Sequence, residues 1–156
     1  MAHHKIVAKI ASQIADFLSD KKLKINKTQI IAMAVIHDIG KIQIPRELSE
    51  SGSLHEKTGF EFAKKLGISE DLADICVLHA NNEYESLDLE VLSVILADKL
   101  WKGQRIDKLE KQMIQKVAIL AQSDYWEIFA EFDSFFEEIA DKGYERILSM
   151  PSIQPT

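Results

Sequence analysis

The sequence contains few of the residues that interrupt regular structure. Six glycines and three prolines in 156 residues are too few for a fold built on many tight turns, so long helices are favoured over an all-β sandwich or barrel. A single cysteine, Cys76, excludes an intramolecular disulfide and a cysteine-rich zinc site. Because Cys76 lies in an apolar run, we expect its thiol to be buried and unreactive.

Positive charge and long apolar runs are also scarce. The chain has 19 basic and 25 acidic residues and a net charge of −6, which argues against non-specific binding to nucleic acid or to an anionic membrane surface. No apolar run reaches the roughly 18 residues that a membrane-spanning helix needs. The N-terminus also lacks the apolar segment of a signal peptide. The sequence therefore predicts a cytoplasmic protein with no membrane or nucleic-acid partner.

The chain length and the spacing of apolar residues predict one all-α domain over residues 1–156. A domain has about 150 residues, so one domain accounts for the whole chain. Apolar residues recur at spacings of three and four, as in the row Val7, Ile10 and Ile14, which is typical of amphipathic helices. We expect a bundle of about six or seven helices and a frayed tail at 149–156. The expected helices are 3–20, 30–36, 53–66, 69–79, 87–101, 107–122 and 123–148.

Several helix boundaries follow from local signals. The apolar run 30–36 is short enough to be a strand, but its Ala and Met residues favour a helix that Asn26 or Thr28 caps and Gly40 stops. Residues 42–52 contain proline, serine and glycine and are predicted to be a loop. The sequence from Ser53 to Glu56 has the form of a capping box, which predicts the start of the third helix.

Most of the histidines occupy the inward ends of apolar helical stripes. A side chain in such a position should point where the core points. Burying a polar group without a partner costs about 1–3 kcal/mol, and any one of these histidines is more often a satisfied core residue than a ligand. Taken together, they could satisfy one another around a divalent cation, and imidazole with carboxylate suits iron, manganese, zinc or nickel. The residues in these positions are His3, His37, His55, His79 and Asp98.

The adjacent pair His37-Asp38 adds to this pattern. Consecutive helical residues diverge by about 100°, but at a helix terminus before Gly40 the backbone can turn both side chains toward one centre. The stretch 34–41, Ala-Val-Ile-His-Asp-Ile-Gly-Lys, resembles the signature of the HD superfamily of metal-dependent phosphohydrolases. The resemblance covers about residues 3–105, and residues 106–148 are predicted to be additional helices.

The resemblance implies a set of metal ligands. The first ligand of the family stands four residues before a Val-Ala pair, which selects His3 over His4. His3, His37, Asp38 and Asp98 would then surround one metal ion. His55 and His79 resemble the additional ligands of members that bind two metals, such as the bacterial HD-type diadenosine tetraphosphate hydrolases, and Asp38 would bridge the two ions. The implied cofactor is one or two divalent ions of iron, manganese, zinc, nickel or magnesium.

The resemblance implies a phosphohydrolase that acts on a small nucleotide or another phosphoester. Asp38 is the implied catalytic residue, and Lys41 and Arg105 are the leading candidates to bind phosphate. Lys99 and Lys102 are weaker candidates, and all four cations could simply be solvated residues at helix ends.

The sequence also allows a function other than catalysis. The alternative to an enzyme is a metal- or nucleotide-binding HD module with little turnover that acts through a protein partner. An aromatic stripe in the last predicted helix, at Trp126, Phe129, Phe132, Phe135 and Phe136, fits the core or the interface of a homodimer.

Overall fold

The computed structural model describes residues 2–48, 50 and 52–149, and these residues form helices and no strand. The predicted all-α class is therefore confirmed. Within the described residues, seven helices are at least seven residues long, and four further helices have only four residues. The long helices are α1 (Ala2–Asp20), α2 (Lys27–Ile36), α3 (Leu54–Lys65), α6 (Leu89–Leu100), α7 (Asp107–Ala121), α8 (Tyr125–Asp141) and α9 (Gly143–Ser149). The short ones are the 3₁₀ helices η1 (Ile39–Ile42) and η2 (Pro45–Leu48), and the α-helices α4 (Glu70–Ala73) and α5 (Ile75–Leu78).

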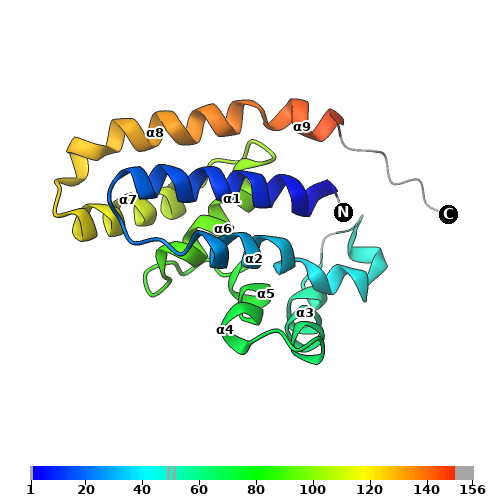
Figure 1. Cartoon of the computed structure of the whole chain (residues 1–156). Coiled ribbons are helices and arrows are strands. Elements are labelled where there is room, and N and C mark those ends of the chain that lie inside the picture. The colour runs from blue at the N-terminus through cyan, green and yellow to red at the C-terminus, as the bar shows by residue number, and fades with distance from the viewer. Residues whose placement is uncertain (1, 49, 51, 150–156) are drawn as a thin grey trace.

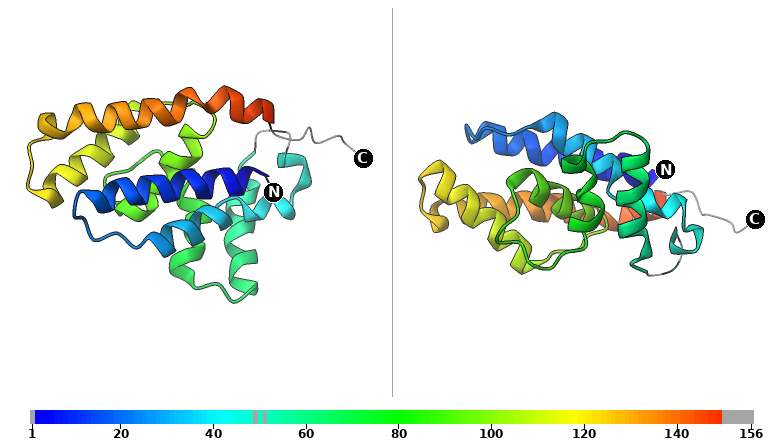
Figure 2. Two further views of the ribbon diagram at one scale, coloured as in Figure 1. Left: turned by 45° about the horizontal axis from the view of Figure 1, so that its top comes forward. Right: turned by 90° about the horizontal axis from the view of Figure 1, so that it is seen from below.

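The helices are arranged around α1, which lies between α2 and the α8–α9 pair (Figure 1). Its partner on one side is α8, where Phe17 stacks on Phe135 at 4.1 Å and meets Phe132 edge-on at 4.8 Å between ring centroids. Figure 2 shows α3, α4 and α5 gathered beyond α2, on the side away from α8. The first turn of α1 lies close to the end of α2, since His3 Nε2 is 3.2 Å from His37 Nε2.

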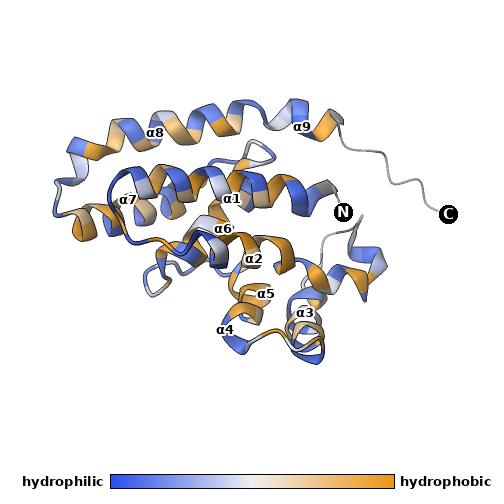
Figure 3. Ribbon diagram, in the orientation of Figure 1, coloured by the Kyte–Doolittle hydropathy of each residue, from blue (hydrophilic) through white to orange (hydrophobic). Residues whose placement is uncertain are grey.

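The core forms from the apolar stripes that the sequence predicts. Val7, Ile10 and Ile14 of α1 are at most 2% exposed. Helix α2 is apolar after its first three residues (Figure 3), and it buries Ile30 and Met33 against the same core. Phe132 and Phe136 of the aromatic stripe are buried here as well, whereas Trp126 is 74% exposed.

The ends of α2 are formed differently from one another. The Asn26 side chain accepts a hydrogen bond from Gln29 N at 3.0 Å, which confirms one of the two predicted caps. The helix ends at Ile36, the predicted last residue, but Gly40 does not stop it, because the backbone already leaves the helical region at Asp38. Gly40 has another role: a Cβ there would lie 1.9 Å from His55 O and 2.6 Å from Gly59 N. Gly40 and Gly59 thus allow η1 and α3 to pack backbone to backbone, next to His55.

The predicted capping box at the start of α3 is wrong. The side chain of Ser53 caps nothing, although Ser53 is the residue before the helix. A carboxylate from the predicted loop takes this role, because Leu54 N and His55 N donate to Glu47 at 3.3 and 3.0 Å. The loop itself contains η2, and residues 49 and 51 lie outside the described residues.

Two helices that the sequence predicts as continuous are interrupted. The helix predicted at 69–79 breaks at Asp74 into α4 and α5, where Val77 N bonds to Asp74 O in a tight turn. The helix predicted at 123–148 breaks after Asp141, where Gly143 meets the chain after α6. A Cβ on Gly143 would lie 2.3 Å from Gly103 N, so this close contact requires glycine. The tail predicted at 149–156 falls, apart from Ser149, outside the described residues.

Two smaller expectations concern Cys76 and membranes. Cys76 is fully buried, which confirms the predicted burial of its thiol; the thiol donates to Ile36 O at 3.3 Å, and burial raises its pKa to about 11. In the described part of the chain, no helix combines the length and apolar character needed to cross a membrane.

Candidate metal centre

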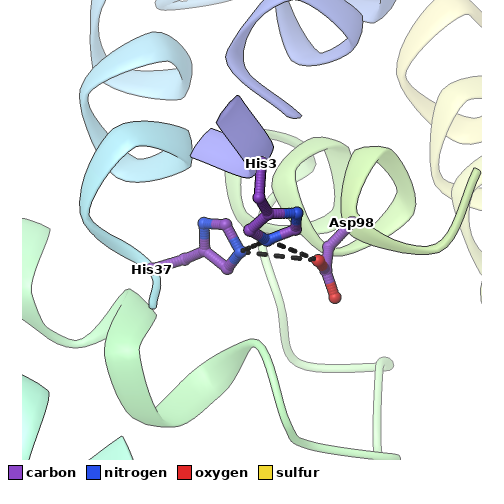
Figure 4. A group of neighbouring side chains, drawn as sticks. All are labelled: His3, His37 and Asp98. Atoms are coloured by element: carbon purple, nitrogen blue, oxygen red, sulfur yellow. Dashed lines mark hydrogen bonds and ion pairs between the residues drawn. The ribbon is translucent and has the colours of Figure 1, made fainter. Parts of the chain in front are cut away.

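Three helices bring histidine and aspartate side chains together. His3 lies in the first turn of α1, His37 directly follows α2, and Asp98 lies in the last turns of α6. Figure 4 shows these three side chains pointing at one another from separate helices. The inward stripe ends predicted from the sequence therefore converge in space.

The first group consists of His3, His37 and Asp98. His3 Nε2 lies 3.2 Å from His37 Nε2 and 3.5 Å from Asp98 Oδ1, and the last two atoms are 3.4 Å apart. Asp38 Oδ2 adds a fourth atom, 3.3 Å from His3 Nε2 and 3.6 Å from His37 Nε2. Two ligands that are each about 2.1 Å from one ion stand about 3.0–3.4 Å apart at angles of 90–110°. The observed spacing is close to that of a metal coordination shell.

The second group consists of His55, His79 and the other oxygen of Asp38. Asp38 Oδ1 lies 3.2 Å from His55 Nε2 and 3.4 Å from His79 Nε2. All three residues are buried, and their atoms lie close enough together to hold one ion. Asp38 thus divides its two carboxylate oxygens between two groups of ligand atoms.

Hydrogen bonds at the other ring nitrogen fix the tautomers of the histidines. His37 Nδ1 donates to Ala34 O at 2.8 Å, and His79 Nδ1 donates to Ile75 O at 3.0 Å. A carbonyl can only accept, so Nδ1 carries hydrogen in both rings, and each neutral ring presents a lone pair on Nε2. These lone pairs face one another and carboxylate oxygens. When the rings are neutral, a divalent cation between these lone pairs and the carboxylate oxygens would satisfy all of them together.

The pKa shifts of His37 and Asp38 also show that the centre favours positive charge beside its carboxylates. Burial disfavours the charged form of His37, but the hydrogen bond and charge of Asp98, with the charge of Asp38, outweigh it and raise the pKa of His37. Burial alone would raise the pKa of Asp38, yet hydrogen bonds from His3 and His79 and the charge on His37 hold it well below its usual range. Asp38 therefore stays ionised, as a metal ligand must be.

Three lysines lie beside these carboxylates. Lys41 Nζ is 2.6 Å from Asp38 Oδ2, and Lys99 Nζ is 3.4 Å from Asp98 Oδ2. After the hydrogen bond and charge of His37, the positive charges of Lys99 and Lys102 help to lower the pKa of Asp98 against its burial. The side chains of Lys41 and Lys99 remain 28% and 25% exposed, so their ammonium groups stand at the border between the centre and solvent.

Arg105, the other predicted phosphate ligand, belongs to a different cluster. Its Nε and one terminal nitrogen donate to the two carboxylate oxygens of Glu110 at 2.8 Å, and the same terminal nitrogen donates to Asp133 at 2.6 Å. Glu110 is only 6% exposed, and these hydrogen bonds raise the pKa of Arg105. The structure therefore ties Arg105 to α7 and α8 rather than to the His/Asp centre.

Replacing Arg105 with alanine is expected to lower stability without loss of metal. The change leaves Glu110 largely buried without its partner, which should cost about 2 kcal/mol, less than the roughly 3–5 kcal/mol of a fully buried pair. Urea unfolding measures the first effect and elemental analysis the second. The double variant Arg105→Met, Glu110→Gln should recover part of the stability. A loss of bound metal in Arg105→Ala would show instead that Arg105 supports the centre.

The sequence did not point to Glu47 at the centre, and it favoured His3 over the neighbouring His4. Glu47, in the predicted loop, accepts a hydrogen bond from His55 Nδ1 at 2.7 Å. No spacing rule pointed to it; the only available signal was that the second nitrogen of a ligand imidazole usually has an acceptor. His4, which lies off the apolar stripe, has its ring 5.7 Å from His37, and burial followed by the charges of His37 and His3 lowers its pKa to about 4.

Comparison with known families assigns the class of the protein. Residues 1–102 match the HD domain, and the chain belongs to this family. The HD family is generally one of metal-dependent phosphohydrolases, and the His/Asp groups described above are compatible with that chemistry. Comparisons with curated proteins and with solved structures gave no match.

Proposed function

We propose that this protein is a phosphohydrolase with two divalent metal ions, which hydrolyses a small phosphoester such as a nucleotide. The observation that carries the proposal is the position of Asp38, whose two oxygens face two separate groups of ligand atoms. His3, His37 and Asp98 with Asp38 Oδ2 would hold one ion, and His55 and His79 with Asp38 Oδ1 would hold the other. The mixture of imidazole and carboxylate suits iron, manganese, zinc or nickel better than magnesium.

Bound divalent ions would supply Lewis acidity toward phosphoryl oxygens and lower the pKa of a water molecule. The chain's own residues orient this chemistry. The carbonyls of Ala34 and Ile75 hold the rings of His37 and His79, so that Nε2 stays directed at the centre. Lys41 and Lys99 supply positive charge at the border with solvent, where they can neutralise an anionic phosphate.

The charge of the centre supports a phosphorylated substrate. Asp38, Asp98 and Glu47 contribute three negative charges, and Lys41 and Lys99 balance two of them. Two divalent ions would then leave the site with a net positive charge inside a protein whose net charge is −6. Such a local field attracts small anions, whereas the remaining surface does not favour a nucleic-acid polyanion.

A homodimer remains a further proposal, for which the exposure of Trp126 is the supporting observation.

A substrate panel tests the proposed activity directly. Protein reconstituted in turn with Mn²⁺, Fe²⁺, Co²⁺, Ni²⁺, Zn²⁺ or Mg²⁺ is assayed with phosphomonoesters, phosphodiesters, nucleoside phosphates and dinucleoside polyphosphates. We expect metal-dependent release of phosphate or a nucleotide from at least one class. His37→Ala, purified in the same way, controls for contaminating phosphatases. Two bound ions without turnover on any class would contradict the enzyme and favour the binding module.

A further inference from the structure

The histidines of the centre differ in what holds their second ring nitrogen. Backbone carbonyls accept from His37 and His79, as in many buried histidines. His55 alone donates to a side-chain carboxylate, that of Glu47. Nδ1 of His3 is buried and has no hydrogen-bond partner among the described residues. One of the two groups of ligand atoms is thus backed by an additional negative charge.

Glu47 is built into this position from several sides. Its Oε2 accepts from His55 Nδ1 at 2.7 Å and from His55 N at 3.0 Å, and its Oε1 accepts from Leu54 N at 3.3 Å. The residue is 6% exposed, although it lies in a short 3₁₀ helix between connecting segments. Gly52 completes the enclosure, because a Cβ there would lie 2.2 Å from Glu47 Oε1.

We propose that Glu47 is a positioning residue that orients His55 and strengthens it as a ligand, and so sets the affinity of the second metal ion. This inference rests on the two-ion centre of the proposed function. The segment after the His-Asp motif would then act on the centre through one hydrogen bond, from His55 to Glu47.

The physical basis is the coupling between the two nitrogens of an imidazole. A carboxylate that accepts from Nδ1–H fixes the tautomer and makes Nε2 a stronger donor to a metal ion. His55 Nε2 is the atom that faces Asp38 Oδ1 at 3.2 Å. Because Glu47 also accepts from two backbone N–H groups at the start of α3, it fixes the ring relative to the helix that carries it. Loss of such a partner typically costs about 10–100-fold in metal affinity or activity.

The variant Glu47→Gln tests the role with little change in shape. We expect calorimetric titration with Mn²⁺ or Zn²⁺ to show the second ion bound about 10–100-fold more weakly than in the wild type. Binding of the first ion, for which His3, His37 and Asp98 are the proposed ligands, should be unchanged. Activity at saturating metal should recover toward that of the wild type, with the metal activation curve displaced to higher concentration.

A second variant and a control separate positioning from general stability. Gly52→Ala keeps the charge of Glu47 but displaces its carboxylate, and should also weaken the second ion selectively. Asp124→Ala removes the carboxylate that accepts from Trp126 N and caps the start of α8, a helix that carries none of the proposed metal ligands. It should lower the melting temperature while leaving both metal affinities unchanged. In Zn²⁺-loaded wild type, ¹⁵N NMR should report a protonated Nδ1 on His55 in a strong hydrogen bond, a signal that Glu47→Gln weakens.

The outcomes distinguish this inference from the proposed function. Two ions bound by Glu47→Gln with the affinities of the wild type would overturn the role of Glu47 and leave the two-ion centre intact. Equal weakening of both ions would also overturn it, because the effect would then be a general loss of structure. A wild type that binds only one ion would overturn the two-ion centre itself. Metal binding as expected without hydrolysis of any substrate would contradict the enzyme and support the role of Glu47.

Discussion

Replacing Asp38 with asparagine is expected to remove nearly all activity and most of the bound metal. The change preserves shape in a residue that is 3% exposed, but it removes the charge that both groups of ligand atoms share. Metal ions contribute several kcal/mol to catalysis at such sites, so activity should fall by about 10³-fold or more. Elemental analysis should find fewer than one ion per chain, and circular dichroism should remain helical.

Asp16→Asn is the matched control for this variant. Asp16 carries a carboxylate on α1 that is 59% exposed and pairs with Lys27 at 2.6 Å. Its replacement should change neither metal content nor activity. Retention of activity near the wild-type level in Asp38→Asn would contradict a metal-centred mechanism.

The double variant His55→Ala, His79→Ala is expected to lose one ion and keep the other. His55 and His79 make up the second group with Asp38 Oδ1, whereas the first group, His3, His37 and Asp98, contains neither of them. Elemental analysis after reconstitution should fall from about two ions per chain to about one, and activity should fall by about 10²-fold or more, because two-metal assistance is lost.

His4→Ala is the control for removing a histidine close to the centre. The ring of His4 lies 5.4 Å from that of His3 but belongs to neither group of ligand atoms. This variant should keep two ions. If the wild type and the double variant both bound one ion and were equally active, the centre would hold a single metal. The family assignment would be unaffected.

Much of the centre could be predicted because its geometry is local to each helix. The position of His3 in the row of Val7 and Ile10 determines which way its ring points, since residues three and four apart share a face. The same argument places His37, His79 and Asp98 at the inward ends of their stripes. Their convergence follows from the helices packing through those stripes.

The features that sequence reasoning missed depend on contacts between distant segments. Glu47 reaches His55 only because η2 folds back over the start of α3, and no periodicity describes a short 3₁₀ helix. The partners of Arg105 include Asp133, which lies 28 positions away on α8. The break before α9 reflects the contact of Gly143 with Gly103. Each of these features depends on which distant segments meet in the tertiary structure, and the local sequence does not encode that.

The central claim is that Asp38 bridges two divalent ions. Anomalous X-ray diffraction from crystals of the Mn²⁺-reconstituted protein tests this most directly, because it locates each ion without reference to activity. We expect two anomalous peaks about 3.5–4 Å apart, one beside each oxygen of Asp38. A single peak, or peaks away from His3, His37, His55, His79 and Asp98, would contradict it.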